Sequence, residues 1–490
     1  MGRNSAIILG GGLGGLECGF ILAKNGVDVT VLERSGSVGG CLRSFSRGGD
    51  VFETGFHYTG GLDPDGPLHP FFRYFGLLGL PWVQLDPECF DEVCIGGESF
   101  PFACGHARFA ERLSERFPHE KDGIARFTAL LKETGDRIFE AFRPGGSEFA
   151  ASLFSRSARE FTESCVSDAL LRKVLAGTIL KMDACGDSLP LYEFAQINDS
   201  FIRSAWRLRG GGSQIAESLA QSVRAFGGRV LCGAEAVSVR VSGGRVSGVT
   251  LAGGETLNAD FVISSLHPAV TLGLLGDSGC VRKVYRDRIS SLANTAGMFT
   301  AGIKLKPGAM RSLNRNIYVH SADADPWSAF QGGTDSVLVS FGGPAAGSDE
   351  ASVLDILAPM HWNEVGRWAD LPSGRRAAGY AAFKQAKAES CIALVRSRLP
   401  ELGDAVDTVY TSTPLTWRDY VRSPEGSAYG IRKDCRDALS TVLSTKTPVP
   451  NLFLAGQSVN LHGLLGVSMT SVFACAQILG METVRRNIFG

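Results

Sequence analysis

Hydrophobic positions near the start of the chain change from a continuous run to a helical spacing and then to a second strand-like run. Residues 6–9 are all apolar, which is typical of a strand buried on both faces of a parallel sheet. Apolar side chains within residues 16–23 then recur at the interval that buries one face of a helix, and Asn-Gly at 25–26 is a common helix stop. Residues 27–32 form the second run, which ends on Glu33. The pattern predicts a strand–turn–helix–strand unit.

The middle of the chain shows a different pattern, which predicts a second region. Hydrophobic spacing indicates helices over residues 109–142, with a break near 117–118, and over residues 154–197. Several strand-like runs and one long helix then predict a sheet covered by a helix, at residues 297–305, 316–320, 336–341 and 379–398.

The turn after the first strand carries the glycine spacing of a dinucleotide-binding fingerprint. Gly10 permits a tight turn, Gly12 lets the backbone approach a pyrophosphate, and Gly15 lets the helix lie close to the strand. Glu33, 18 residues after Gly15, can accept hydrogen bonds from both ribose hydroxyls, which favours FAD or NAD over NADP. A glycine-rich turn without a ligand is the alternative, and the complete unit argues against it.

Other glycine-rich segments divide the rest of the chain. Residues 209–226 begin with Arg-Gly-Gly-Gly and predict a helix; we expect no strand before these glycines and therefore no second nucleotide-binding unit. Residues 229–249 alternate as strands around a hairpin turn at 242–245. Near the end of the chain, a buried strand over 451–457 precedes a helix over 463–479.

Composition narrows the class of protein. The 490 residues are enough for two or three domains, and a hydrophobic content of 44% is typical of a globular chain. The 49 basic and 50 acidic residues nearly cancel, which argues against nucleic-acid binding. Twelve cysteines are scattered without a CxxC pair, so we expect no metal site and a reducing, cytoplasmic compartment. The first apolar run passes directly into the fingerprint, so we do not interpret it as a secretory signal.

Two stretches raise the question of membrane contact. Residues 451–481 contain no Asp, Glu, Lys or Arg, but Gln457, Asn460, His462 and glycines would be costly against lipid. A buried strand and core helix explain this stretch better. Basic residues in the middle region permit peripheral contact with a lipid surface, and a solvated helix face explains them equally well: Arg156, Arg159, Arg172 and Lys173.

Two segments that follow the fingerprint carry a family resemblance. Gly39-Gly40-Cys41 and Phe45, followed by Glu-Thr-Gly-Phe-His-Tyr at residues 53–58, resemble the phytoene desaturase, carotenoid isomerase and retinol saturase superfamily of flavoproteins. The Gly-Gly-Cys start and the Thr-Gly-x-His-Tyr sequence are most similar to the retinol saturase branch. Plain carotenoid desaturases usually place Arg after the paired glycines, where this chain has Cys41.

The resemblance implies an α/β fold in which a Rossmann-type FAD-binding domain is joined to a mixed α+β substrate domain, as in flavin amine oxidases and phytoene desaturases. The FAD-binding domain would be discontinuous, with residues 1–85, 205–290 and 421–490. The substrate domain would comprise residues 86–204 and 291–420.

The resemblance also implies a reaction. Hydride would pass between FAD and a carbon of an extended apolar polyene, carotenoid- or retinoid-like, by saturation, desaturation or isomerisation. The retinol saturase branch favours saturation. NAD(P)H would be an external reductant, because no dedicated domain for it is found in the sequence. The sequence leaves the oligomeric state open.

The candidate cofactor-binding residues come from the fingerprint, from the resemblance and from the final helix, whose N-terminus would stabilise negative charge on a reduced flavin. They are Gly10, Gly12, Leu13, Gly14, Gly15, Glu33, Arg34, Gly39, Gly40, Arg43, His57, Val237, Ser264, Gly456, Gln457, Gly463, Leu464, Gly466 and Val467. His57, Tyr58 and His462 are the candidates beside the flavin ring, and a structural role suits each of them equally; the catalytic residues stay unassigned. Large side chains that suit a hydrophobic channel are Trp362, Trp368, Trp417 and Tyr420.

Two other functions stay open at this stage. A flavin amine oxidase shares the nucleotide-binding domain but usually has a different C-terminal pattern around an aromatic cage. A non-catalytic binder of prenyl groups, of the Rab escort type, shares the ancestral fold without using flavin. Glu33, the paired glycines at 39–40 and Gly456 argue against such a binder.

Overall fold

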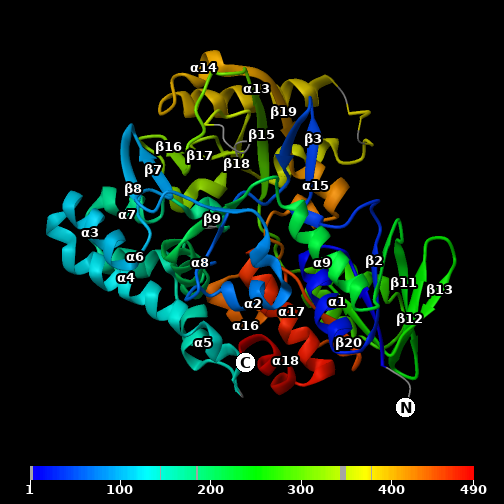
Figure 1. Ribbon diagram of the computed structural model, residues 1–490. Helices are drawn as coiled ribbons and strands as arrows, with labels where there is room; N and C mark the ends of the chain where they lie inside the picture. The colour runs from blue at the N-terminus through cyan, green and yellow to red at the C-terminus, as the bar shows by residue number, and fades with distance from the viewer. Residues whose placement is uncertain (1–3, 144, 184–185, 343–348, 373, 377) are drawn as a thin grey trace.

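Two large sheets and a group of helices organise the molecule. The computed structural model describes residues 4–143, 145–183, 186–342, 349–372, 374–376 and 378–490. In Figure 1 the larger sheet lies in the upper part of the view, the nucleotide-binding unit at the lower right, and most of the helices of residues 106–203, drawn in cyan to teal, at the left.

The nucleotide-binding unit is built on a five-stranded parallel sheet with the order β10-β2-β1-β14-β20. The predicted strand, helix and strand at the start of the chain are confirmed as β1 (Ser5–Leu9), α1 (Leu13–Lys24) and β2 (Asp28–Glu33). The other strands come from distant parts of the sequence: β10 (Arg229–Cys232), β14 (Phe261–Ser264) and β20 (Leu452–Leu454). The sheet is therefore discontinuous in sequence, while the exact domain limits stay a prediction.

Helix α1 packs against α9 (Ser213–Ala225) and α17 (Gly463–Leu479). All of α1 from Leu13 to Ala23 is buried, which explains why its sequence is apolar on every side except at Glu17. The strand and helix predicted near the end of the chain are confirmed as β20 and α17.

The second sheet has seven strands in the order β19-β15-β18-β17-β16-β7-β8. The three predicted runs are confirmed as β15, β16 and β17, and the predicted long helix is α13, which packs on this sheet. Alternate residues face opposite ways: Val337 and Val339 belong to the core beneath α13, whereas Leu338 belongs to the core on the other face. The bounds are β7 (Asp91–Ile95), β8 (Glu98–Phe102), β15 (Gly297–Leu305), β16 (Asn316–His320), β17 (Ser336–Phe341), β18 (Val353–Met360), β19 (Val406–Ser412) and α13 (Ala378–Arg396).

Helices from the middle of the chain cover the other face of this sheet. The predicted helical stretch over 154–197 is interrupted, because Asp168 accepts a hydrogen bond from Leu171 N at 2.9 Å and starts a new helix; residues 184–185 of that stretch lie outside the described part. The helices are α3 (His106–Arg116), α4 (Lys121–Asp136), α5 (Glu148–Phe154), α6 (Ala158–Cys165), α7 (Ala169–Leu175) and α8 (Leu191–Arg203).

The expectation that no strand precedes the glycines at 210–212 is wrong. Strand β9 (Ala205–Leu208) ends just before them. It pairs antiparallel with β5 (Thr59–Gly60) and β6 (Trp82–Gln84) in a small separate sheet, so it is not part of a second nucleotide-binding unit.

Shorter elements complete the described structure, and within the described residues no helix has the length and apolar character needed to cross a membrane. The remaining elements are β3 (Ser44–Arg47), β4 (Asp50–Glu53), β11 (Ala236–Ser242), β12 (Arg245–Leu251), β13 (Thr256–Asn258), α2 (His69–Phe75), α10 (Pro268–Leu274), α11 (Lys283–Ser290), α12 (Trp362–Val365), α14 (Leu402–Ala405), α15 (Pro414–Val421), α16 (Ala438–Thr441) and α18 (Met481–Phe489).

Gly15 tests the close contact between α1 and β1. A Cβ at this position would lie 1.9 Å from the carbonyl oxygen of Gly10. We expect Gly15→Ala to lower the free energy of unfolding by about 1–3 kcal/mol or more, because the backbone has to move apart. Gly273→Ala is the matched control in helix α10, where a Cβ meets nothing within 4 Å. We expect this substitution to raise the free energy of unfolding by up to about 1 kcal/mol, because alanine favours a helix more than glycine does. Equal effects of the two substitutions in chemical denaturation would contradict the close approach.

The buried Glu17 makes stability depend on pH. It lies between α1 and α17, where it accepts a hydrogen bond from Ser468 Oγ at 2.6 Å, and burial raises its pKa to about 8. The pKa of Glu17 in the folded protein lies above its ordinary value near 4.5. Glu17 therefore destabilises the folded protein most above pH 8, where the buried carboxyl group is ionised, and this destabilisation disappears as the pH falls toward 4.5. Glu17→Gln should therefore stabilise the protein at pH 8, by on the order of 2 kcal/mol, and this advantage should shrink toward pH 5. The measurement is the free energy of unfolding of Glu17→Gln and of the wild type in denaturation experiments. The same difference between the two proteins at pH 5 and at pH 8 would refute the raised pKa of Glu17.

Candidate active site

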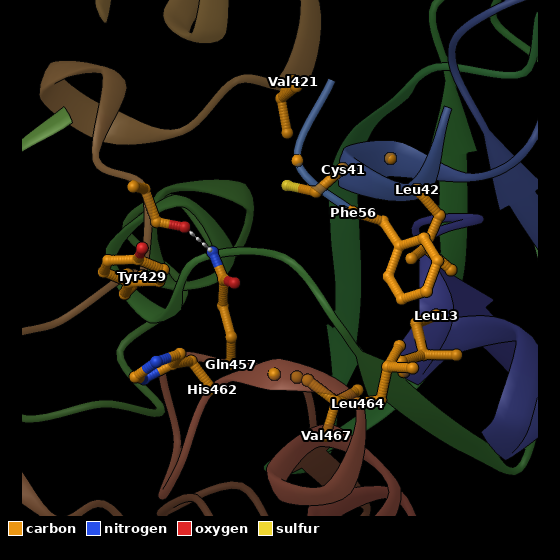
Figure 2. Close-up of a pocket in the computed structure, with 18 of the residues that line it drawn as sticks. Leu13, Cys41, Leu42, Phe56, Val421, Tyr429, Gln457, His462, Leu464 and Val467 are labelled. Carbon is orange, nitrogen blue, oxygen red and sulfur yellow. Dashed lines mark hydrogen bonds between the residues drawn. The ribbon is translucent and has the colours of Figure 1, made fainter. Parts of the chain in front are cut away.

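A cavity of about 380 Å³ lies where the nucleotide-binding sheet meets the helices and the seven-stranded sheet. Its wall includes the turn after β1, the paired glycines at 39–40, residues 55–60 and the start of α17. Figure 2 shows Leu13, Leu42 and Phe56 on one side of the cavity and Tyr429 and His462 on the other. The cavity therefore joins the nucleotide-binding unit to the second region.

Glu33 lines this cavity. Its two carboxylate oxygens accept hydrogen bonds from the backbone N–H of Gly11 at 2.9 Å and of Ser35 at 2.8 Å. These bonds hold the carboxylate at the end of β2, where it lines the cavity next to the glycine turn. A carboxylate in this place can still accept the hydroxyl groups of a ribose through its remaining lone pairs.

Two helix N-termini point unpaired backbone donors at the cavity. Neither the residue before α1, Gly12, nor the residue before α17, His462, makes a side-chain cap. Residues of both first turns line the cavity, and no side chain of a capping residue competes there for their backbone N–H groups. Because helix N-termini attract negative charge, this cradle suits a pyrophosphate at α1 and an electron-rich ring at α17. The donor set fits a flavin dinucleotide.

Glycines let the N-termini of α1 and α17 lie close together. A Cβ on Gly14 would lie 3.1 Å from Val467 Cγ1 and 3.2 Å from Gly456 Cα, so the start of α1 touches the β20–α17 connection. The loop with the paired glycines approaches from the other side, where Gly39 N donates to Gly11 O at 2.8 Å. Larger residues at these points would push the loops into the ligand space.

Tyr58 and Lys181 form a polar part of the wall. The Tyr58 hydroxyl donates to Asp91 Oδ2 at 2.8 Å and lies 2.5 Å from the Tyr318 hydroxyl. Lys181 Nζ lies 3.3 Å from the same Asp91 oxygen. Burial raises the pKa of Asp91 and Tyr58 and lowers that of Lys181, so this group of side chains can hold a shared proton.

His57 faces the cavity as a neutral ring. Burial, aided by the charge of Arg207, lowers its pKa to about 4, and its Nε2 has no hydrogen-bond partner among the described residues. Its Nδ1 lies 3.6 Å from Asp355 Oδ2, and burial raises the pKa of that carboxyl group to about 8. The contact at neutral pH therefore joins an uncharged imidazole to a largely protonated acid.

His462 is held on both sides. Its Nε2 lies 2.9 Å from the carbonyl oxygen of Lys181 and its Nδ1 lies 3.2 Å from Glu193 Oε1. Its ring also lies against Tyr429, with the centroids 4.4 Å apart. His462 therefore lines the cavity but is fixed by structural contacts.

Most of the remaining wall on the side of the second region is apolar. Side chains from α8 and from β15, β17 and β18 line it, together with one from the 3-10 turn that precedes α8. They are Leu180, Ile197, Phe201, Met298, Leu338 and Leu357. An apolar cavity with a few polar groups is typical of a site for a hydrophobic small molecule.

The structure brings most of the predicted site residues together. The predicted residues that line the cavity are Gly10, Gly12, Leu13, Gly14, Glu33, Gly39, Gly40, His57, Tyr58, Gly456, Gln457, His462, Gly463, Leu464 and Val467.

Six predicted residues lie elsewhere, and their roles toward a cofactor stay predictions. Val237 is an exposed residue of β11, and Ser264 is buried with its hydroxyl 2.7 Å from Thr271, so the next residue, Ser265, lines the cavity instead. Gly15 and Gly466 are packing positions, where a Cβ would strike a backbone oxygen. The other two are Arg34 and Arg43, which donate to the carbonyl oxygens of Asp419 and Tyr420.

The four large aromatic residues considered for a channel suit a core equally well, and one of them lines the cavity. Trp417 lines the cavity, but Trp368 packs against Tyr380 beneath α13, and Tyr420 is 58% exposed. Trp362 belongs to the same core beneath α13.

Sequence reasoning missed Lys181, Gln196 and Ser200, which line the cavity. The signal was weak, because Gln196 and Ser200 are two of several polar residues on α8, and Lys181 lies in the short 3-10 turn before it.

The basic residues considered for lipid contact have partners within the protein. Arg159 pairs with Glu163 at 3.0 Å, and Lys173 Nζ donates to Ala322 O at 3.0 Å. Among the described residues no group of side chains could hold a metal ion, and the described cysteines are all free; Cys185 lies outside the described residues.

Replacement of Glu33 tests the nucleotide end of the site. We expect Glu33→Ala to weaken FAD binding about 10–100-fold, because one or two charge-assisted hydrogen bonds to the ribose are lost. The measurement is the flavin content of the purified protein and titration of the apoprotein with FAD. Glu217→Ala, an exposed carboxylate on α9, is the control. Unchanged affinity for FAD in the Glu33 variant would contradict the assignment of this end of the cavity.

Comparison with known proteins agrees with this geometry. The chain is 26% identical to the human all-trans-retinol 13,14-reductase, over 99% of this chain and 86% of that protein. It is 23% identical to the phytoene desaturase of Neurospora crassa, again over 99% of this chain and 86% of the relative. Among solved structures, a putrescine oxidase bound to putrescine matches the fold with a TM-score of 0.64 and 16% identity, covering 97% of this chain and 99% of that one.

A family model assigns the chain directly. The model described as flavin containing amine oxidoreductase matches residues 13–278, a range that starts in the glycine turn and includes three strands of the nucleotide-binding sheet. The α/β fold with a Rossmann-type domain and a second mixed domain is thereby confirmed. The chain belongs to the flavin containing amine oxidoreductase family.

Proposed function

We propose that the protein is an FAD-dependent oxidoreductase that acts on a carbon–carbon bond of an extended apolar polyene, of carotenoid or retinoid type. One observation carries the proposal: a cradle of uncapped helix N-termini and the Glu33 carboxylate opens into the same cavity as an apolar wall. The names of the reductase and desaturase relatives support the same class of substrate.

The residues that would hold FAD follow from the cradle. Glu33 would accept the ribose hydroxyls, and the first turn of α1 would bind the pyrophosphate. The N-terminus of α17 would lie at the ring, where its positive end favours negative charge. When bound, FAD supplies or accepts the hydride. The domain division at residues 1–85, 205–290 and 421–490 against the rest is part of this proposal.

The protein itself would orient the polyene and exclude water. Met298, Leu338 and Leu357 present aliphatic side chains from three adjacent strands, a smooth surface for a conjugated chain. Polar groups at Tyr58 and Lys181 would lie at one point along it. NAD(P)H is proposed as an external reductant. A cytoplasmic protein with peripheral contact to a membrane would meet such a substrate, and this stays a prediction.

A panel of polyenes tests the proposal. Reduced and oxidised holoprotein is incubated anaerobically with all-trans-retinol, phytoene, lycopene and prolycopene, and the absorption bands are followed. We expect a blue shift in the reduced sample, which means saturation. A red shift in the oxidised sample would mean desaturation, and a small shift without net redox change would mean isomerisation. Turnover of putrescine or another amine with release of hydrogen peroxide, and no reaction with any polyene, would contradict the proposal.

A matched pair of variants tests the apolar wall. Leu338→Asp places a charge on the face of β17 that lines the cavity, and Val337→Thr changes the opposite face of the same strand. We expect the aspartate to abolish polyene binding while FAD still binds, because the charge would have to stay desolvated beside the substrate. The readout is quenching of protein fluorescence by the polyene. Normal polyene binding by Leu338→Asp would place the substrate elsewhere.

A further inference from the structure

A network of buried polar side chains lies behind the cavity wall and reaches it at two points. Tyr58 and Lys181 line the cavity, whereas Asp91 and Tyr318 lie behind them, fully buried. The parallel pairing of β16 with β7 builds the network, because it places Asn316 directly opposite Asp91 and Tyr318 two residues farther on.

Asp91 is the centre of the network. Its Oδ2 accepts the Tyr58 hydroxyl at 2.8 Å and lies 3.3 Å from Lys181 Nζ. Its Oδ1 accepts Asn316 Nδ2 at 3.1 Å. One carboxylate oxygen therefore connects a hydroxyl on the cavity wall with an ammonium group.

The charged and titratable groups around Tyr58 can be named. They are Asp91 on β7, Tyr318 on β16, Lys181 from the turn before α8, Arg207 on β9 and the neighbouring His57. Arg207 is buried and donates to Asn316 Oδ1 at 3.3 Å. The Asp91 carboxylate thus contacts the Lys181 ammonium group directly, and it is connected to the Arg207 guanidinium group through Asn316.

A structural role alone does not explain this arrangement. The Lys181 side chain is 6% exposed and that of Asp91 0%, and burying such a pair costs several kcal/mol per ion before the attraction offsets it. Apolar side chains of the same volume would pack a sheet face at least equally well. Buried titratable groups that open on a cavity are typical of catalytic sites.

We propose that Tyr58 is the catalytic acid that protonates the polyene, and that Lys181 and Asp91 return the proton to it. This proposal rests on the proposed function. Saturation of a carbon–carbon double bond adds one hydride, with both electrons, and one proton. Reduced FAD, when bound, would supply the hydride to one carbon. The O–H bond of Tyr58 breaks as a C–H bond forms at the neighbouring carbon.

The proton then has a short path back. The Lys181 ammonium gives a proton to the Asp91 carboxylate at Oδ2, and Asp91 passes a proton to the phenolate of Tyr58. Lys181 is then a neutral amine, and solvent restores its proton after the product leaves. The second phenol, Tyr318, stabilises the phenolate through the 2.5 Å contact between the two hydroxyls. In the direction of desaturation the same groups take the proton away.

The three histidines on the wall, His57, His267 and His462, suit this role less well. Burial lowers the pKa of His267 to about 4, and its Nδ1 accepts the backbone N–H of Ala269. His57 is neutral, and its pKa near 4 leaves it without a proton to give at neutral pH. Both ring nitrogens of His462 are engaged, one with a backbone carbonyl and one with Glu193. Tyr58 lines the cavity and its hydroxyl is hydrogen-bonded to Asp91, which in turn contacts the Lys181 ammonium group.

Single-turnover kinetics of the reduced holoprotein test the relay. The variants are Tyr58→Phe and Tyr318→Phe, which remove one hydroxyl each, and the control is Tyr74→Phe, a buried tyrosine in the core of the nucleotide-binding unit that is not part of the cavity wall. The probe is the fastest-converted of all-trans-retinol, phytoene and lycopene. We expect Tyr58→Phe to slow conversion about 10²–10⁴-fold, with FAD content and polyene affinity unchanged.

Two further readouts separate a proton relay from a packing effect. The rate of Tyr58→Phe should fall as the pH rises, because solvent replaces the lost acid, while the wild type keeps a flatter profile. In an ultraviolet difference titration, which needs no turnover, Asp91→Asn should lower the pH at which the buried tyrosines ionise, because a negative charge beside them is lost.

The outcomes distinguish the relay from the proposed function. If the wild type converts a polyene and Tyr58→Phe keeps the same rate and pH profile, the relay is refuted and the proposed function stands. If the flavin-loaded, reduced wild type converts none of the polyenes, both are refuted. A slow Tyr58→Phe with an altered pH profile, beside a normal Tyr74→Phe, supports the relay.

Discussion

The close approach of two helix N-termini is the constraint on which the rest of the structure depends. Helix α1 begins against the connection between β20 and α17, with Gly14 next to Gly456 and Val467. The two helices are separated by more than 400 residues of sequence, and all of the second region is inserted between them. Because both N-termini are uncapped and face one cavity, the fold offers a long, donor-lined cradle that only an extended ligand can occupy in full.

The seven-stranded sheet forms part of the cavity wall on the side away from the nucleotide-binding unit. Its five inner strands are buried on both faces: one face packs against α13, and the other contributes Met298, Leu338 and Leu357 to the cavity. The same face carries Tyr318, and β7 carries Asp91, so apolar and polar parts of the wall come from neighbouring strands. A dry surface beside a proton-holding group is suited to chemistry on carbon, where water would compete.

Local features of the site could be predicted from the sequence. The glycine turn, the helix after it, Glu33 and the final strand and helix are encoded by contiguous residues with strong conformational preferences, and the structure has them where they were expected. The side chains of Arg34 and Arg43 were expected at the cofactor, but they bind carbonyl oxygens at the end of α15. The sequence around the two arginines does not indicate this contact, because the partner residues are distant in the chain.

Features that depend on distant pairing could not be predicted. The register between β7 and β16 joins Asp91 to Asn316 across 225 residues, and nothing in either strand alone indicates the partner. Lys181 is one polar residue in an apolar stretch, and its role depends on the turn that brings it to Asp91. Leu338 and Leu357 look like ordinary strand residues; the pleat of the sheet decides which face they occupy.

The most direct test of the account is a crystal structure of the protein with FAD and a bound polyene. The account predicts the pyrophosphate at the N-terminus of α1, the ribose at Glu33, the ring at the start of α17 and the conjugated chain between the ring and Leu338 and Leu357. A flavin bound elsewhere, or a polyene that lies outside this cavity, would contradict it.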